Sequence, residues 1–346
     1  MEIEPKIKML GKFLVRGLAV FLLLFILWYR LEFQYAFGQL KGQVEIILNS
    51  EDIEHYMLDP DFSEEYKAKL RYVGMVKVFA EKSLGLNPSD NYTTVYDQKG
   101  EDILWNVTAS EKFALIPYKW EFPIAGAFSY KGFFDRDKAI AEYKLKVKEG
   151  FDVSLRPVSA WSTLGIFRDP ILSNMLDRSD EELAELVIHE MTHATLYVKD
   201  DISFNENLAT FIGEKGAVLF LKEYFRDQPN RYIDYVKEKK GEKYWIKYII
   251  GEANKLDSLY QAITHLVDVD KERLKADFLK EFIIDASFKR RYYGLGEVSL
   301  DSNTINNTYF LSYLRYHSSQ ECLDSMYRYQ FNGDFADMLN YFEDLY

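Results

Sequence analysis

The chain has 346 residues, with 43 Lys and Arg, 55 Asp and Glu, and a formal net charge of −12. This length suits two domains or one large one, and 48% hydrophobic residues suffice for a sizeable core, which excludes a disordered chain. The acidic balance argues against a nucleic-acid-binding protein. Cys322 is the single cysteine, so a metal site would need His and carboxylate ligands.

The first element in chain order is an apolar run at residues 13–29, FLVRGLAVFLLLFILWY. Its length is near the lower bound for a membrane-spanning helix, with lysines and Arg16 on its N-terminal side and aromatic residues at its end. The positive-inside rule predicts a cytoplasmic stub and bilayer anchor over 1–31, followed by an extracytoplasmic domain over 32–346, periplasmic in a bacterium. A cleaved signal peptide and a buried core helix are the alternatives.

The rest of the chain predicts an α+β domain that is mainly α. Helical periodicity is expected over residues 33–48, 63–84, 135–149, 180–198, 205–221 and most of the chain after 227. Short alternations such as ILWNV and KFALI within residues 92–130 predict the strands of a small β-sheet. Residues 151–167 are expected to be extended, although Pro157 and Gly165 argue against a regular central strand.

An H-E-x-x-H motif, formed by His189, Glu190 and His193, lies inside the helix predicted over residues 180–198. Residues at i and i+4 share one face of a helix, so the two imidazoles can bind one Zn²⁺. Glu190, between them, can then reach a water at the metal and act as a general base. The spacing therefore predicts a hydrolytic zinc site.

Such a site needs a third protein ligand and one open position. Glu206 begins the next predicted helix, and a short turn would bring its carboxylate to the histidine pair. Glu214, two turns later on the same face, is the alternative ligand or an acceptor for a ligand histidine. Ser203 and Glu206 could instead form a capping box. Asp201 is a candidate for orienting a ligand histidine.

These motifs resemble those of a known family. ELVIHEMTHATLYVKDDISFNENLATFIGEKGA is similar to the H-E-x-x-H and F-N-E-x-x-A signature of the bacterial putative aminopeptidase family. FPIAGAFSYKGFF and DVSLRPVSAWSTLGIFRDPILSNML resemble two of its upstream segments, so the likeness covers about residues 30–220. The resemblance implies a zincin-like domain of the gluzincin type, with His189, His193 and Glu206 as zinc ligands and Glu190 as the base.

The activity that the resemblance implies is a zinc-dependent aminopeptidase with one Zn²⁺ per chain and short peptides as substrates. An endopeptidase or a cell-wall peptide amidase could use the same zinc chemistry. A scaffold in which zinc is only structural is a further alternative, although structural sites are closed by four ligands.

The sequence leaves three supporting roles open. Candidates for stabilising the oxyanion are Tyr130, Tyr197, His265 and His317. Candidates for binding a substrate ammonium are Glu121, Asp135 and Asp169. A candidate edge for pairing with the substrate backbone is the segment 159–165. Outside the motif, the histidines expected to be packed or solvated are His55, His265 and His317.

Overall fold

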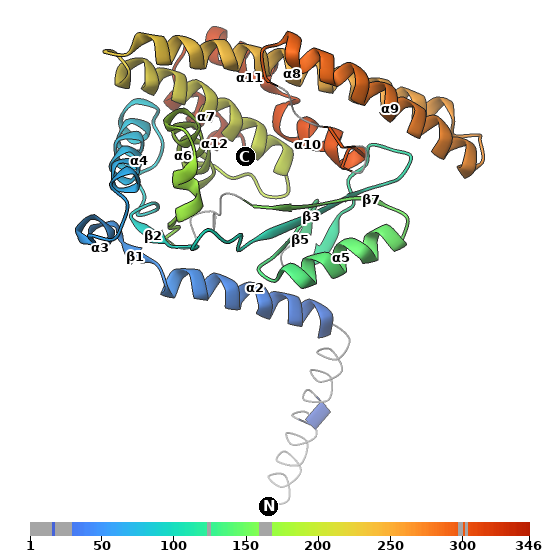
Figure 1. The fold of residues 1–346 in the computed structure, drawn as a ribbon, viewed down its shortest axis with the longest axis horizontal. Helices are drawn as coiled ribbons and strands as arrows, with labels where there is room; N and C mark the ends of the chain where they lie inside the picture. Colours follow the sequence, from blue (N-terminus) through green and yellow to red (C-terminus); the bar gives the residue numbers. More distant parts are fainter. Residues whose placement is uncertain (1–15, 18–29, 123–125, 159–167, 297–299, 302–303) are drawn as a thin grey trace, which may run out of the picture. The chain divides into compact units, whose positions relative to one another are not determined.

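The structure is a computed structural model that describes residues 16–17, 30–122, 126–158, 168–296, 300–301 and 304–346 (Figure 1). The chain divides into two compact units, Met1–Leu48 and Asn49–Tyr346. The first unit includes helix α2 (Arg30–Leu48). The second carries the sheets and the remaining described helices. The division expected between residues 31 and 32 stays a prediction.

The expected membrane anchor needs correction. Among the described residues, no helix is both long enough and apolar enough to cross a membrane. Residues 13–29, on which the expectation depended, lie outside the described residues except for Arg16 and Gly17. Helix α2 has charged residues at both ends and in its middle, so it lacks the ~20 predominantly apolar residues of a spanning helix. This finding contradicts the expected membrane-anchored, extracytoplasmic placement.

The second unit is mainly helical, as the periodicity predicts. Its α-helices are α3 (Ile53–Leu58), α4 (Glu64–Ser83), α5 (Arg136–Lys148), α6 (Asp180–Thr195), α7 (Ile202–Tyr224), α8 (Pro229–Ala262), α9 (Asp268–Tyr292), α10 (Asn307–His317), α11 (Gln320–Ser325) and α12 (Phe335–Leu345). Helix α6 begins with a capping box in which Ser179 and Glu182 each bind the backbone N–H of the other. This cap satisfies two otherwise unpaired donors and fixes where the helix begins.

Small sheets complete the α+β fold. The strands are β1 (Glu51–Asp52), β2 (Thr94–Tyr96), β3 (Trp105–Ser110), β4 (Trp120–Phe122), β5 (Gly126–Phe128), β6 (Lys131–Phe133), β7 (Asp152–Pro157) and β8 (Ile171–Leu172). They pair in the orders β1-β2-β8, β6-β3-β7 and β4-β5. Residues 112–116, expected to be a strand, form a loop that the Glu111 N–H closes by donating to the Ile116 carbonyl.

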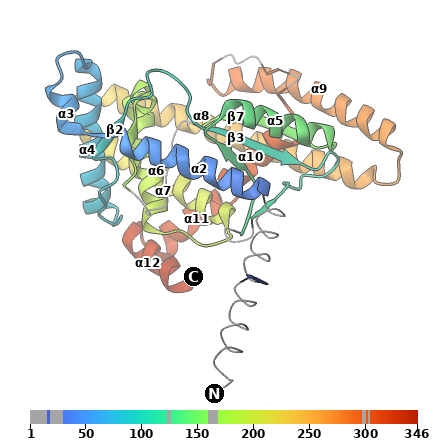
Figure 2. The ribbon, with the colours of Figure 1, turned by 90° about the horizontal axis from the view of Figure 1, so that it is seen from below.

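The sheet β6-β3-β7 lies between two helices. Figures 1 and 2 show α5 and α10 on opposite faces of β3 and β7, and both helices contact both strands. Asn307, fully buried at the start of α10, donates its N–H to Asp152 Oδ2 (2.9 Å) and its side-chain amide to the Glu111 carbonyl (2.8 Å). Its Oδ1 accepts from the Tyr260 hydroxyl of α8 (2.6 Å). The first turn of α10 is therefore fixed to both the sheet and α8.

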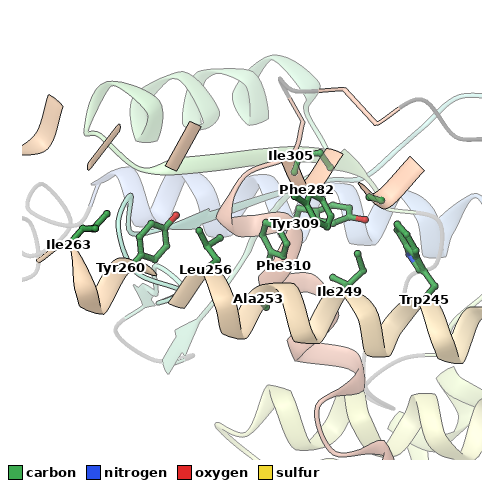
Figure 3. Close-up of a cluster of buried hydrophobic side chains, with 11 residues drawn as sticks. Trp245, Ile249, Ala253, Leu256, Tyr260, Ile263, Phe282, Ile305, Tyr309 and Phe310 are labelled. Carbon is green, nitrogen blue, oxygen red and sulfur yellow. The ribbon is translucent and has the colours of Figure 1, made fainter. Parts of the chain in front are cut away.

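Helices α8, α9 and α10 enclose one apolar cluster (Figure 3). The buried side chains of α8 recur every three or four residues, which is the period of one helix face. Those in this cluster are Trp245, Ile249, Ala253, Leu256 and Tyr260, and Ile263, directly after the helix, continues the row. Phe282 of α9 and Phe310 of α10 pack in the same cluster with ring centroids 5.0 Å apart. This packing holds α10 against the long helices.

Helices α6 and α7 approach each other closely at a glycine. A Cβ added to Gly213 of α7 would lie 3.1 Å from the Glu185 carbonyl oxygen and 3.2 Å from the His189 Cβ on α6. A larger residue would push the two helices apart at the level of the predicted metal ligands. The glycine therefore allows side chains of α7 to reach the histidine face of α6.

Candidate metal centre

His189, His193 and Glu206 meet at the junction of α6 and α7, and could together hold a metal ion. The two Nε2 atoms are 3.2 Å apart, and Glu206 Oε2 lies 3.4 Å from each of them. His193 is buried, and the side chains of His189 and Glu206 are each 17% exposed. The three predicted ligands thus form a nearly equilateral, largely buried triangle.

The triangle fits a tetrahedral ion better than it fits a hydrogen-bonded cluster. Ligand atoms 2.0–2.1 Å from a tetrahedral Zn²⁺ lie about 3.3 Å from each other, close to the spacing of these three atoms. Charge-assisted N–H···O bonds are shorter, about 2.7–2.9 Å. Two nitrogens and one oxygen are a donor set that zinc accepts.

Glu206 reaches the triangle because a tight connection reverses the chain. Helix α6 ends at Thr195, three residues before the expected end at 198, and α7 begins at Ile202. Asp201 caps α7 by accepting from the Phe204 N–H (2.9 Å), so neither the expected Ser203 cap nor a histidine-orienting role for Asp201 is observed. An earlier helix start places Glu206 in the second turn of α7 rather than the first.

Asn205 closes this connection. Its side-chain oxygen accepts the Val198 N–H (2.8 Å), and its amide donates to the Val198 carbonyl (2.7 Å). The side chain of Asn205 is only 2% exposed. One asparagine thereby satisfies both backbone groups of Val198 and holds the residue before Glu206 in place.

Replacing Asn205 with Ala is expected to lower the free energy of unfolding by about 1–3 kcal/mol, because the Val198 N–H loses its partner and the Val198 carbonyl keeps only the longer bond from the Asp201 N–H (3.4 Å). The same change should weaken metal binding by releasing Glu206. Chemical denaturation and chelator competition measure the two effects. Asn340→Ala, at an exposed position, serves as the control. An Asn205→Ala protein as stable as the wild type would contradict this role.

Electrostatics at the triangle follow from its burial and its charges. Loss of hydration would raise the pKa of Glu206, but the adjacent His189 and His193 outweigh it and lower that pKa to about 2. Loss of hydration raises the pKa of Glu190, and the two histidines only partly offset this. Glu206 is thus an anion facing the histidines, whereas Glu190 is a stronger base than a solvated carboxylate.

A cavity of about 660 Å³ opens at the triangle. His189, Glu190, His193 and Glu206 all line it. The cavity residues that the sequence did not single out include Glu185, Lys239, Glu242, Arg315 and Tyr316. Glu185 precedes His189 by one helical turn on the same face of α6, a spacing that could have identified it. The others come from α8 and α10, and local patterns give no signal for them.

The structure also places the supporting candidates. Tyr130 and Tyr197 line the cavity, whereas His265 is exposed and His317 does not reach the cavity. The ammonium candidates outside the cavity lining are Glu121, which is exposed, Asp135, which caps α5, and Asp169, which is buried. His55 is solvated, as expected, and contacts Glu51. The expected edge at residues 159–165 lies outside the described residues.

Glu214, the alternative ligand, is not part of the triangle. Loss of hydration, followed by the charge of the nearby Glu185, raises its pKa to about 7 from an ordinary value of 4.5. The folded protein therefore holds this carboxyl protonated while the unfolded chain would ionise it. The contribution of the Glu214 carboxyl to the free energy of unfolding is fully present below its pKa in the unfolded chain, which is 4.5. It is lost as the pH rises through the pKa of about 7 in the folded protein.

Glu214→Gln should remove this pH-dependent loss. We expect the variant to exceed the wild type in free energy of unfolding by about 3 kcal/mol at pH 8, with little difference at pH 4.5. Urea denaturation at the two pH values measures it. Glu238→Gln, an exposed position on α8, is the matched control. An identical stability difference at both pH values would contradict the raised pKa.

The comparisons with known proteins bear on these residues. The chain matches the sequence model of the family described as "Putative aminopeptidase" over residues 34–346. Searches of curated proteins and of solved structures find no match. The matched region includes His189, Glu190, His193 and Glu206 and spans most of the chain. The chain therefore belongs to the putative aminopeptidase family.

Proposed function

We propose that this protein is a zinc-dependent aminopeptidase that hydrolyses short peptides. The observation that carries the proposal is the triangle of His189, His193 and Glu206 in the wall of a cavity that Glu190 also lines. Membership of a peptidase family supports the reaction class, and the spacing of the ligand atoms supports zinc.

Bound zinc would lower the pKa of a coordinated water and polarise the scissile carbonyl. Glu190 is proposed to accept the proton of the attacking water and to deliver it to the leaving amine. Its place between the two ligand histidines on α6 keeps it within reach of the metal site while leaving the ligand set complete. Tyr130 and Tyr316, which line the cavity, are proposed as donors to the developing oxyanion.

The number of candidate ligands favours this proposal over a structural zinc scaffold, because three ligands would leave one coordination position open. Within the described part of the chain, the metal-binding group comprises three residues. Structural zinc sites usually have four protein ligands, whereas catalytic sites keep one position for water or substrate. The cavity beside the triangle gives a substrate access to that position.

Strand β7 is proposed to align the substrate backbone. Among the described strands it lies at the edge of its sheet, and its end, Arg156 and Pro157, lines the cavity. The Val158 N–H donates to the Leu104 carbonyl. In an antiparallel pair only every second residue bonds to the partner strand, so the backbone N–H and C=O of Leu155 point away from β3. An extended peptide can add to such an edge.

The substrate ammonium is proposed to bind toward α6 and α8. Glu185 and Glu242 both pair with Lys239 at 2.7 Å, so two carboxylates share one cation. All three side chains line the cavity, and the excess negative charge favours a substrate cation. These residues replace the ammonium candidates expected from the sequence.

Paired peptides that differ only at the amino end test the proposal. Zinc-loaded protein should release alanine from trialanine and should cleave N-acetyl-trialanine at least about 100-fold more slowly, because acetylation removes the recognised charge. Chromatography of the products measures both rates. Equal rates would favour an endopeptidase or an amidase. No hydrolysis of either peptide would refute a peptidase acting on short peptides.

A further inference from the structure

Arg315 differs from the other Lys and Arg side chains that line the cavity, because those have interaction partners. Lys239 is paired with Glu185 and Glu242, Arg156 donates to the Ser154 hydroxyl, and Arg178 also has an interaction partner. For the partly buried Arg315, the structure records no hydrogen bond or ion pair of the guanidinium with any described residue. A guanidinium carries five donors, so this cavity contains unused capacity to bind an anion.

The position of Arg315 is fixed relative to the metal centre. Asn207, which directly follows the ligand Glu206, donates its side-chain amide to the carbonyls of Arg315 (2.7 Å) and Ser203 (2.9 Å). The same side chain accepts the Ser319 N–H through its oxygen (2.8 Å). This buried asparagine ties the last turn of α10 to the second turn of α7. The start of α10 is held by Asn307, so the helix is anchored at both ends.

Arg315 lines the same cavity as His189 and Glu206, and the ring centroid of the next residue, Tyr316, lies 6.5 Å from that of His189. Loss of hydration and the charge of Glu206 raise the pKa of Tyr130 to about 12, and Arg315 opposes that rise. The pKa of Tyr316 is raised by the same two causes and again opposed by Arg315. Both tyrosines line the cavity, so the cation and the metal centre face one shared space.

We infer that Arg315 binds the terminal α-carboxylate of the substrate, so that the enzyme acts on peptides of a few residues with a free C-terminus. This inference rests on the proposed peptidase function. Every unmodified peptide carries that anion, and a guanidinium can bind a carboxylate through two parallel hydrogen bonds. Glu185 and Glu242 beside Lys239 would thus attract the ammonium of a short peptide, and Arg315 would bind its α-carboxylate.

Binding to an inactive enzyme tests the inference without relying on turnover. Calorimetry would titrate zinc-loaded Glu190→Gln protein with trialanine and with trialanine amide. The free acid is expected to bind about 10- to 100-fold more tightly, the range for a hydrogen bond to a charged group. Adding Arg315→Gln should reduce the affinity for the acid to that for the amide and leave the amide unaffected. Arg226→Gln, at an exposed position, should keep the full preference.

The outcomes separate this inference from the proposed function. Equal affinity for acid and amide in the Glu190→Gln protein overturns the role of Arg315, as does an Arg315→Gln change that weakens both ligands equally. Wild-type enzyme that hydrolyses nothing but binds the acid selectively refutes the peptidase function and leaves the carboxylate site standing. If Arg315→Gln protein loses zinc or fails to fold, Arg315→Lys replaces it. That variant keeps the charge but not the planar fork, and should show a reduced preference.

Discussion

Replacing Glu190 with Gln is expected to lower kcat on short peptides by about 10²- to 10⁴-fold while zinc remains bound. The amide has nearly the same shape as the carboxylate but cannot accept the proton of the attacking water, and general base catalysis contributes about this much. His189, His193 and Glu206 are unchanged, so the ligand set stays intact. Initial rates with trialanine and metal analysis of the same sample measure the two quantities.

The control for this change is Glu238→Gln, the same substitution at an exposed position of α8. It should retain both rate and zinc. A Glu190→Gln enzyme that turned over at the wild-type rate would exclude Glu190 as the base. Loss of zinc along with activity would instead assign Glu190 to the metal site itself.

The second large effect is expected at the third ligand. Glu206→Ala should weaken zinc binding by more than the roughly 10- to 100-fold that residues outside the ligand set usually contribute. It removes one of the three proposed ligands, and its Oε2 lies 3.4 Å from the Nε2 atom of each histidine. His193→Ala should have a comparable effect. Competition with a zinc chelator measures the affinities, and circular dichroism shows whether the variants are folded.

Glu214→Ala is the matched comparison, because it removes a carboxylate from the same helix outside the triangle. Its effect on zinc affinity should be small. The reverse order of the two variants would move the third ligand to Glu214, and equal small effects would exclude both carboxylates from the metal site.

The fold was partly predictable because several of its elements depend on local patterns. Periodicity identified the long helices, and the capping box placed the start of α6 at the expected residue. The end of α6 and the start of α7 were predicted at the wrong residues. Both boundaries depend on hydrogen bonds to the side chains of Asp201 and Asn205, which a pattern of apolar residues does not encode. The apolar run at 13–29 predicted an anchor, and among the described residues the helices give that prediction no support.

The sequence by itself determined the pairing of His189 with His193, because i and i+4 lie on one face of any α-helix. It also placed Glu190 between them. The resemblance of three segments to the putative aminopeptidase family is confirmed by the match over residues 34–346. Only the tertiary structure shows that Glu206, and not Glu214, lies beside the two histidines, since this depends on how closely α7 crosses α6 at Gly213.

Arg315 is the clearest case of a residue that sequence reasoning could not find. It lies more than a hundred residues after the metal motif, in a helix whose local pattern shows only that one face is buried. Its place beside the cavity depends on Asn207, Asn307 and the apolar packing of α10 against α8 and α9. Contacts between residues so distant in the chain form only when the whole core packs, and therefore tertiary structure alone brings this cation to the metal centre.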